Sequence, residues 1–192
     1  MVGDYGTNMA MAMQQKRKFR PPLDAGTLEE MALNYAGRFA TTRAKLMAYL
    51  GRKLRERGWA GTHEPQVEAM ADKFVRLGYV DDAAFALAKA RSLTGRGYGE
   101  HRVRQALARA GVEEEQSIAA RGLAEDQAVE AALRFAKRRA IGPFAARSPC
   151  PAEREKALAA MIRAGHRFAL ARAIIDLEPG ENPDYEELFN MR

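Results

Sequence analysis

The feature that most constrains the fold of this chain is a helix ending that occurs three times. The segments LRERGW, LARAGV and MIRAGH begin at Leu54, Leu107 and Met161, which lie 53 and then 54 positions apart, and each has a glycine four residues after its first residue. A glycine there can adopt the left-handed conformation that closes a helix, while the first residue contacts the one after the glycine. Three unrelated helix ends would also give such segments, but a fixed period is typical of repeat proteins.

The chain around these glycines predicts helices rather than strands. It is rich in Ala, Leu, Arg and Glu, and it lacks alternating runs of Val, Ile and Thr. We therefore predict an all-α fold, an elongated array of three tandem three-helix repeats that stack because one such unit buries little. Repeat 1 is expected to span residues 28–80, repeat 2 residues 81–124 and repeat 3 residues 125–178, with helices near 30–39, 43–57, 64–77, 82–93, 99–109, 113–121, 125–139, 151–164 and 168–176. Residues 1–27 are expected to form a flexible basic arm and residues 179–192 an acidic tail.

The charged residues are distributed with the same repeat period. The net charge of +6 and the isoelectric point near 9.6 suit an anionic partner. The first two helices of each repeat are basic, with seven Lys/Arg against one Glu in 32–59, whereas the connecting segments are acidic, with one Lys/Arg against five acids in 112–127. Solubility alone would account for an alternating surface. Three repeats of one polarity, however, can align their cations into a stripe that binds nucleic acid or an acidic partner. The candidate residues of this stripe are Arg38, Arg43, Lys89, Arg91, Arg96, Arg102, Lys137, Arg138 and Arg139.

The glycine-rich segment GRGYG, residues 95–99, raises the question of a phosphate-binding loop. A dinucleotide fingerprint needs G-x-G-x-x-G after a strand, and a P-loop needs a Gly-Lys-Ser/Thr ending. The spacing here is G-x-G-x-G after a helical segment, so we predict a helix–helix turn that uses positive φ. Downstream of GYV, Asp81 or Asp82 is expected to cap the next helix rather than bind a metal.

Other reactive residue types do not assemble an active site. His63, His101 and His166 fall in different repeats and form no H-x-x-x-H pair, and Cys150 has no second thiol. We therefore predict no catalytic residues, no metal site, no cofactor and no enzymatic activity. The chain shows no signal peptide and no apolar stretch of the roughly 20 residues that a membrane span needs, so we expect a cytoplasmic protein without membrane contact.

The central segment LGYVDDAAFA, followed by Arg91, the glycine turn, Val103, Leu107 and GV at 111–112, resembles the signature of the RecX family, regulatory partners of the RecA recombinase. The resemblance covers about residues 30–178. It implies a curved, right-handed array without enzymatic activity. It also implies a monomer that binds the RecA–DNA filament in its groove and modulates, mainly inhibits, the recombinase, ATPase and coprotease functions of RecA in DNA repair and the SOS response. Some family members contact single- or double-stranded DNA directly.

Two other functions remain open at this point. Basic second helices after short turns also suit a stand-alone DNA- or RNA-binding protein. A helical-repeat array can equally serve as an adaptor for an unrelated protein. Binding to bare nucleic acid with a steep salt dependence would favour the former, and capture of a partner other than RecA would favour the latter.

Overall fold

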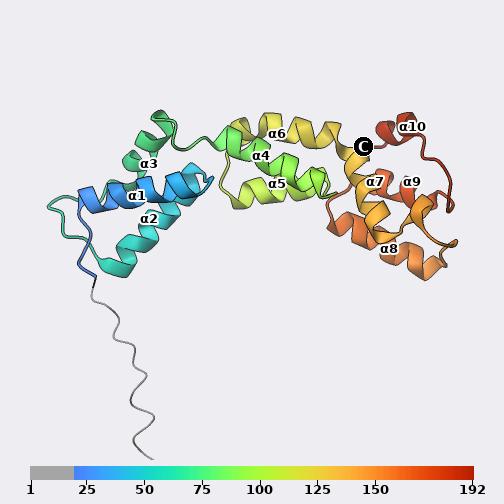
Figure 1. Cartoon of the computed structure of the whole chain (residues 1–192), viewed down its shortest axis with the longest axis horizontal. Helices are drawn as coiled ribbons and strands as arrows, with labels where there is room; N and C mark the ends of the chain where they lie inside the picture. Colours follow the sequence, from blue (N-terminus) through green and yellow to red (C-terminus); the bar gives the residue numbers. More distant parts are fainter. Residues whose placement is uncertain (1–19) are drawn as a thin grey trace, which may run out of the picture.

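The computed structural model describes residues 20–192, which form an elongated, bowed row of helices (Figure 1). The chain is all-α, as expected, and its helices follow one another along the row in three groups. The helices are α1 (Ala25–Arg38), α2 (Arg43–Arg57), α3 (Val67–Arg76), α4 (Asp82–Gly95), α5 (Glu100–Arg109), α6 (Glu114–Asp126), α7 (Ala128–Arg139), the 3-10 turn η1 (Gly142–Phe144), α8 (Pro151–Arg163), α9 (Phe168–Asp176) and α10 (Tyr185–Asn190). The array of three tandem three-helix repeats predicted from the glycine period is therefore the observed fold, with α1–α3, α4–α6 and α7–α9 as the groups.

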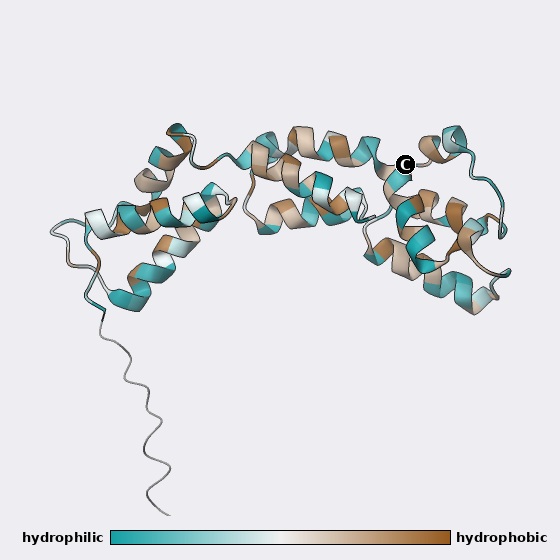
Figure 2. Cartoon of the chain, viewed as in Figure 1, coloured by the Kyte–Doolittle hydropathy of each residue, from teal (hydrophilic) through white to brown (hydrophobic). Residues whose placement is uncertain are grey.

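Each group has its own apolar core, and the cores succeed one another along the row. The first includes Leu28, Leu46 and Phe74, the second Ala90, Val103 and Leu107, and the third Phe135, Met161 and Ile174, all buried. Figure 2 shows that apolar and polar residues alternate along the helices of all three groups. Tyr98 packs against both the second and the third core, so the two groups are joined through it.

The recurring glycines end helices as the sequence predicts. Gly111 and Gly165 have φ of 69° and 95°, and the residue after each donates its backbone N–H to the carbonyl oxygen of Leu107 or Met161, five residues earlier. This pairing satisfies carbonyl groups that a helix end otherwise leaves free. Gly97 closes α4 in the same way, with φ of 79° and a bond from Tyr98 N to the Leu93 carbonyl oxygen. Of the three glycines in GRGYG, Gly97 alone takes positive φ.

Both ends of the chain contain more structure than a flexible arm and a tail. Residues 1–19 lie outside the described part of the chain, but within the expected arm α1 already begins at Ala25, capped by the Asp24 carboxylate, and Leu23 is completely buried in the first core. At the other end the expected acidic tail contains α10, which begins with Asp184 as its cap and buries Leu188 in the third core. Leu23 and Leu188 lie in short segments without a repeating apolar pattern, so the sequence gives no periodic signal there.

The groups are connected by two joints of one design. In each, the first turn of the second helix of one group contacts the glycine that ends the second helix of the next group. At the first joint, the Thr42 hydroxyl donates to the carbonyl oxygen of Ala110 at 2.6 Å, and a Cβ on Gly111 would lie 2.3 Å from the Cβ of Ala44. At the second joint, the backbone N–H of Gly99 donates to the carbonyl oxygen of Ala164 at 3.0 Å. Ala110 and Ala164 each directly precede the glycine.

The second joint is the tighter of the two, because backbone meets backbone. A Cβ on Gly99 would lie 2.3 Å from the carbonyl oxygen of Gly165, and one on Gly165 would lie 2.5 Å from the backbone nitrogen of Arg102. His166 is buried beside this contact, with its ring against Phe135 and its Nε2 3.2 Å from the carbonyl oxygen of Gly97. GRGYG is thus more than a turn, since it also forms one side of the joint between the second and third groups.

Gly58 is the first glycine of the series, and within residues 20–192 no helical group precedes its own. The segment before α1 takes that place: Leu23 donates its N–H to the Gly58 carbonyl oxygen at 3.0 Å and accepts from the N–H of Ala60 at 2.8 Å. The pattern corresponds to the second joint, where His101 N–H donates to the carbonyl oxygen of Gly165 at 3.2 Å.

Candidate nucleic-acid interface

A basic groove lies at the second joint, where α5, α7 and α8 meet. Its cavity of about 470 Å³ is lined by Tyr98, Phe135 and Ile141 together with five cationic side chains, those of Arg102, Arg138, Arg139, Lys156 and Arg163. Three helices that are far apart in the sequence supply these cations. They converge because the contact between Gly99 and Gly165 holds the start of α5 against the end of α8.

Aromatic rings and backbone oxygens position several of the arginines. The guanidinium carbons of Arg96 and Arg102 lie 5.8 and 5.9 Å from the centre of the Tyr98 ring. Arg138 and Arg139 lie 5.4 and 5.8 Å from the centre of the Phe135 ring. Arg138 also donates a hydrogen bond to the Arg96 carbonyl oxygen, at the end of α4. Cation–π contacts of this kind restrict long side chains, which lowers the entropy lost when a ligand binds.

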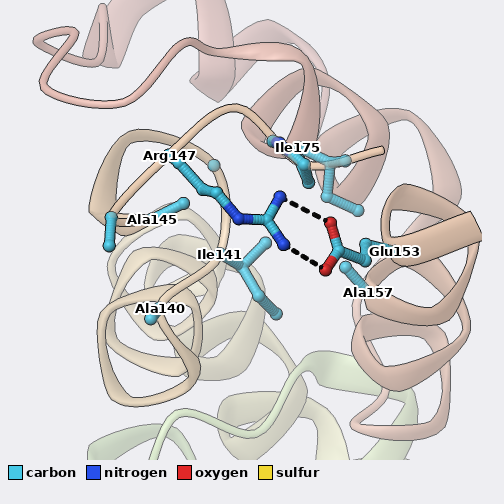
Figure 3. A pocket seen from close by; sticks show the side chains of 10 residues that line it. Ala140, Ile141, Ala145, Arg147, Glu153, Ala157 and Ile175 are labelled. Carbon is cyan, nitrogen blue, oxygen red and sulfur yellow. Dashed lines mark hydrogen bonds and ion pairs between the residues drawn. The ribbon is translucent and has the colours of Figure 1, made fainter. Parts of the chain in front are cut away.

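The carboxylate in the groove lining, that of Glu153, is already paired. Figure 3 shows its two oxygens facing the guanidinium of Arg147, at 2.7 and 3.0 Å. These hydrogen bonds, together with one from the backbone N–H of Cys150, lower the pKa of Glu153 to about 2. Glu153 therefore brings no unpaired negative charge to the groove, and an anion entering it meets a positive surface. Arg147 and Glu153 also line the neighbouring cavity of about 260 Å³ beside Ile175.

The structure brings three of the candidate residues from the sequence into this groove, Arg102, Arg138 and Arg139, with Arg96 beside it. Lys137, also exposed, lies on the same turn of α7, but it does not line the cavity. Arg91 is exposed on α4, and Arg38 is exposed at the end of α1 in the first group. The candidates thus form one cluster at the second joint and scattered positions elsewhere.

Lys89 belongs to a smaller basic site near the first joint. Burial of Lys45 lowers the pKa of its ammonium group, and the nearby charge of Lys89 lowers it further. The Lys45 ammonium lies 4.3 Å from the centre of the Phe85 ring. Lys45 is the third residue of α2, as Arg102 is the third residue of α5, so the two joints place a cation at corresponding positions.

Arg43 is engaged within the first group. Its guanidinium pairs with Asp72 at 2.6 Å and Glu68 at 3.0 Å, both on α3, and its backbone N–H donates to the Asp82 carboxylate at 2.8 Å. The hydrogen bonds that Arg43 donates to Asp72 and, to a lesser extent, to Glu68 raise its pKa. The structure therefore uses Arg43 to hold α2 to α3 and to the start of α4.

Two residues of the groove, Lys156 and Arg163, were not among the sequence candidates. They lie on α8, seven residues apart and beyond the loop at 145–149, where the charged run at 153–156 mixes both signs and forms no basic cluster. Their spacing of two helical turns places them on one face, which is the signal that could have found them. Elsewhere the cap of α4 follows expectation, with Asp81 accepting from the N–H of Ala84 at 2.8 Å.

The described residues offer neither a membrane helix nor a metal cluster. Within residues 20–192, no helix is both long enough and apolar enough to cross a bilayer. Over the same range, no group of three or more His, Cys, Asp or Glu side chains is placed to hold a metal ion. The site that the fold presents is thus a basic groove in a helical-repeat scaffold.

Comparisons with known proteins agree with this class. Residues 81–120 match the family model described as RecX, second three-helix domain. The chain is also 34% identical over 162 residues to Regulatory protein RecX of Myxococcus xanthus, an alignment that covers 79% of this chain and 86% of the relative. The chain belongs to the RecX family of regulatory proteins.

Two solved structures have a similar fold. The crystal structure of RecX from Lactobacillus salivarius matches with a TM-score of 0.56 and 18% identity, over 78% of this chain and 93% of that one. A second crystal structure, of regulatory protein RecX, matches with a TM-score of 0.54 and 20% identity, over 79% of this chain and 73% of that one. At these identities the likeness concerns the fold, the array of three-helix repeats.

Proposed function

We propose that this protein is a non-enzymatic, cytoplasmic regulator that binds RecA nucleoprotein filaments and mainly inhibits the recombinase, ATPase and coprotease activities of RecA. The observation that carries the proposal is membership of the RecX family, through 34% identity to Regulatory protein RecX of Myxococcus xanthus. In this proposal a monomer acts through its three repeats, α1–α3, α4–α6 and α7–α9, and it modulates RecA in DNA repair and the SOS response.

The shape and charge of the array support this function. A filament of recombinase on DNA is long and anionic, and an elongated row of repeats can contact several of its subunits. Contacts spread over separate repeats gain affinity through effective concentration, so none of them has to be strong alone. The exposed cations Arg91, Arg96 and Lys137, with the groove at the second joint, are the proposed contact residues, while Arg43 contributes through the fold.

A titration of RecA-dependent ATP hydrolysis on single-stranded DNA tests the proposal. We expect hydrolysis to fall as the protein is added, and the double variant Arg91→Glu/Arg96→Glu to inhibit less while keeping its helicity and melting temperature. Unchanged hydrolysis and strand exchange at a concentration equal to that of RecA would refute the function. A large loss of stability in the variant would instead assign these arginines a structural role.

A stand-alone nucleic-acid-binding protein is the second candidate, and the basic groove is the observation that favours it. This candidate predicts tight binding to bare DNA or RNA with a steep salt slope, and no dependence of that binding on RecA.

A further inference from the structure

We infer that the groove at the second joint binds the phosphate backbone of a single nucleic-acid strand. The inference rests on the proposed function in one respect, because a RecA filament is where the protein would meet such a strand. It assigns to the groove a role that the rest of the basic surface does not share.

Charge is the first argument. Five cations converge on one cavity, and its acidic residue is held by Arg147 in a bidentate pair. Cations gathered on one surface repel one another, and an anion with several charges relieves this repulsion when it binds. A chain of phosphates carries one negative charge per nucleotide and so matches a run of cations along a groove.

The kind of cation is the second argument. Four of the five are arginines, Arg102, Arg138, Arg139 and Arg163. The planar guanidinium forms paired hydrogen bonds with phosphate oxygens and stacks on flat groups, unlike the lysine ammonium. Arg102 and Arg139 are already set against the Tyr98 and Phe135 rings, so their charged ends are partly oriented before a ligand arrives.

The shape of the site favours one strand over a duplex. The cations line a concavity of about 470 Å³ between α5, α7 and α8. A flexible single strand can enter a concavity of this size, whereas a duplex is a stiff rod that is too wide to enter it. Grooves that bind single strands combine cations along the backbone with an aromatic side chain that contacts a base or sugar. Tyr98 is a partly buried aromatic residue in this lining and fits that role.

The joint itself fixes the spacing of the cations. Arg102 belongs to the second group, and Lys156 and Arg163 to the third, so the groove has its full set of cations only when the two groups are docked. The Gly99–Ala164 and His101–Gly165 backbone hydrogen bonds set that docking. The groove is therefore a property of the array rather than of one repeat.

The test measures the anisotropy of a fluorescein-labelled thymidine oligonucleotide with the full-length protein and without RecA. We expect Arg102→Glu/Arg163→Glu to weaken binding by about ten-fold or more, and to reduce the slope of log affinity against log salt by roughly one to two. Arg102→Gln/Arg163→Gln should fall between this variant and the wild type. Melting temperatures within a few degrees of the wild type would exclude misfolding as the cause.

The control is Arg55→Glu/Arg109→Glu, which makes the same charge change. Both residues are exposed on second helices, neither lines the groove, and neither forms an ion pair with any residue of the described chain. We expect this variant to bind within about two-fold of the wild type. Equal weakening in both variants would show attraction by net charge alone and would overturn the assignment of the groove.

Competition identifies the ligand. Unlabelled single-stranded oligonucleotide should displace the probe, and polyglutamate at the same charge concentration should not. Efficient displacement by polyglutamate would mean that the groove takes an acidic peptide, and equal displacement by duplex would remove the preference for a single strand.

Failure of the inference is distinct from failure of the proposed function. If the groove variant binds the oligonucleotide like the wild type but both inhibit RecA, only the inference falls, and if the wild type binds the oligonucleotide without affecting RecA, only the function falls.

Discussion

The two joints share a design but differ in what holds them. At the first joint a side chain makes the contact, since the Thr42 hydroxyl reaches the carbonyl oxygen before Gly111. At the second joint the main chain makes it, through Gly99 N–H and the carbonyl oxygen before Gly165. A hydroxyl at the end of a side chain can bridge a gap between two main chains, whereas a backbone donor requires the two main chains to be in direct contact. The second joint therefore needs glycine on both sides and the first on one.

The charge at the two joints also differs. A cavity of about 280 Å³ at the first joint is lined by Asp81, Asp82 and Glu113 around Arg43. The groove at the second joint has five cations instead. The geometry that links consecutive groups thus leaves the charge of the neighbouring surface free to vary, and a repeat array can carry a different binding site at each joint.

The largest expected effect concerns glycine at the second joint. Gly99→Ala should destabilise the protein by roughly 2–4 kcal/mol, because its Cβ would lie 2.3 Å from the backbone oxygen of Gly165. Gly95→Ala, in the same GRGYG segment, meets no atom within 4 Å and should be neutral or stabilising by about 0.5–1 kcal/mol, since it ends a helix. Thermal denaturation followed by circular dichroism compares the two, and equal stability of Gly99→Ala and the wild type would contradict the tight joint.

The second effect is the pH dependence that His166 gives to this joint. Burial lowers its pKa from 6.5 to about 4 in the folded protein, although the bond to Gly97 opposes the shift. Below about pH 6.5 the unfolded chain binds a proton that the folded chain does not, so the free energy of unfolding falls as the pH drops from 6.5 towards 4. The contribution lost between pH 7 and pH 5 is about 2 kcal/mol.

Urea denaturation at pH 7 and pH 5 measures that contribution. His166→Gln should make the difference between the two pH values smaller by this amount, whereas His63→Gln, at an exposed position, should leave it as in the wild type. If His166→Gln kept the pH dependence of the wild type, that dependence would come from the carboxylates instead.

The smallest effect is expected at the first joint. Thr42→Val keeps the shape of a fully buried side chain but removes the donor to Ala110 and the helix cap that accepts from Lys45 N–H. We expect a loss of about 1–2 kcal/mol. Chemical denaturation should show this loss in Thr42→Val and none in Thr62→Val, whose residue is exposed. A loss as large as that of Gly99→Ala would mean that the two joints do not differ in the way described.

Much of the fold could be predicted because its signals are local. A glycine after an amphipathic run marks a helix end wherever it occurs, so the ends of the helices at Arg57, Arg109 and Arg163 follow from Gly58, Gly111 and Gly165. The helix starts were less exact, since α3 begins at Val67 rather than residue 64 and α1 at Ala25 rather than residue 30. Those starts depend on which neighbours cover the first turn, which is a tertiary property.

The site was predictable only in part, and for the same reason. The run at 137–139 is visible as a basic cluster, but Arg163 joins Arg102 only across the second joint. Arg43 has the same residue type as the groove arginines, yet its partners Asp72 and Glu68 come from the following helix. Packing between helices decides whether an arginine faces a ligand or a carboxylate of its own chain. The pattern of residues along the sequence does not reveal that packing.

The segment before α1 has a consequence for assembly. Any array whose successive units fit head to tail presents complementary ends, and complementary ends invite polymerisation between copies. Here Leu23 fills the place on Gly58 that the helix start of another copy would need, through two backbone hydrogen bonds and a completely buried side chain. The residues just before α1 thus cover the surface of the first group through which a further unit would attach.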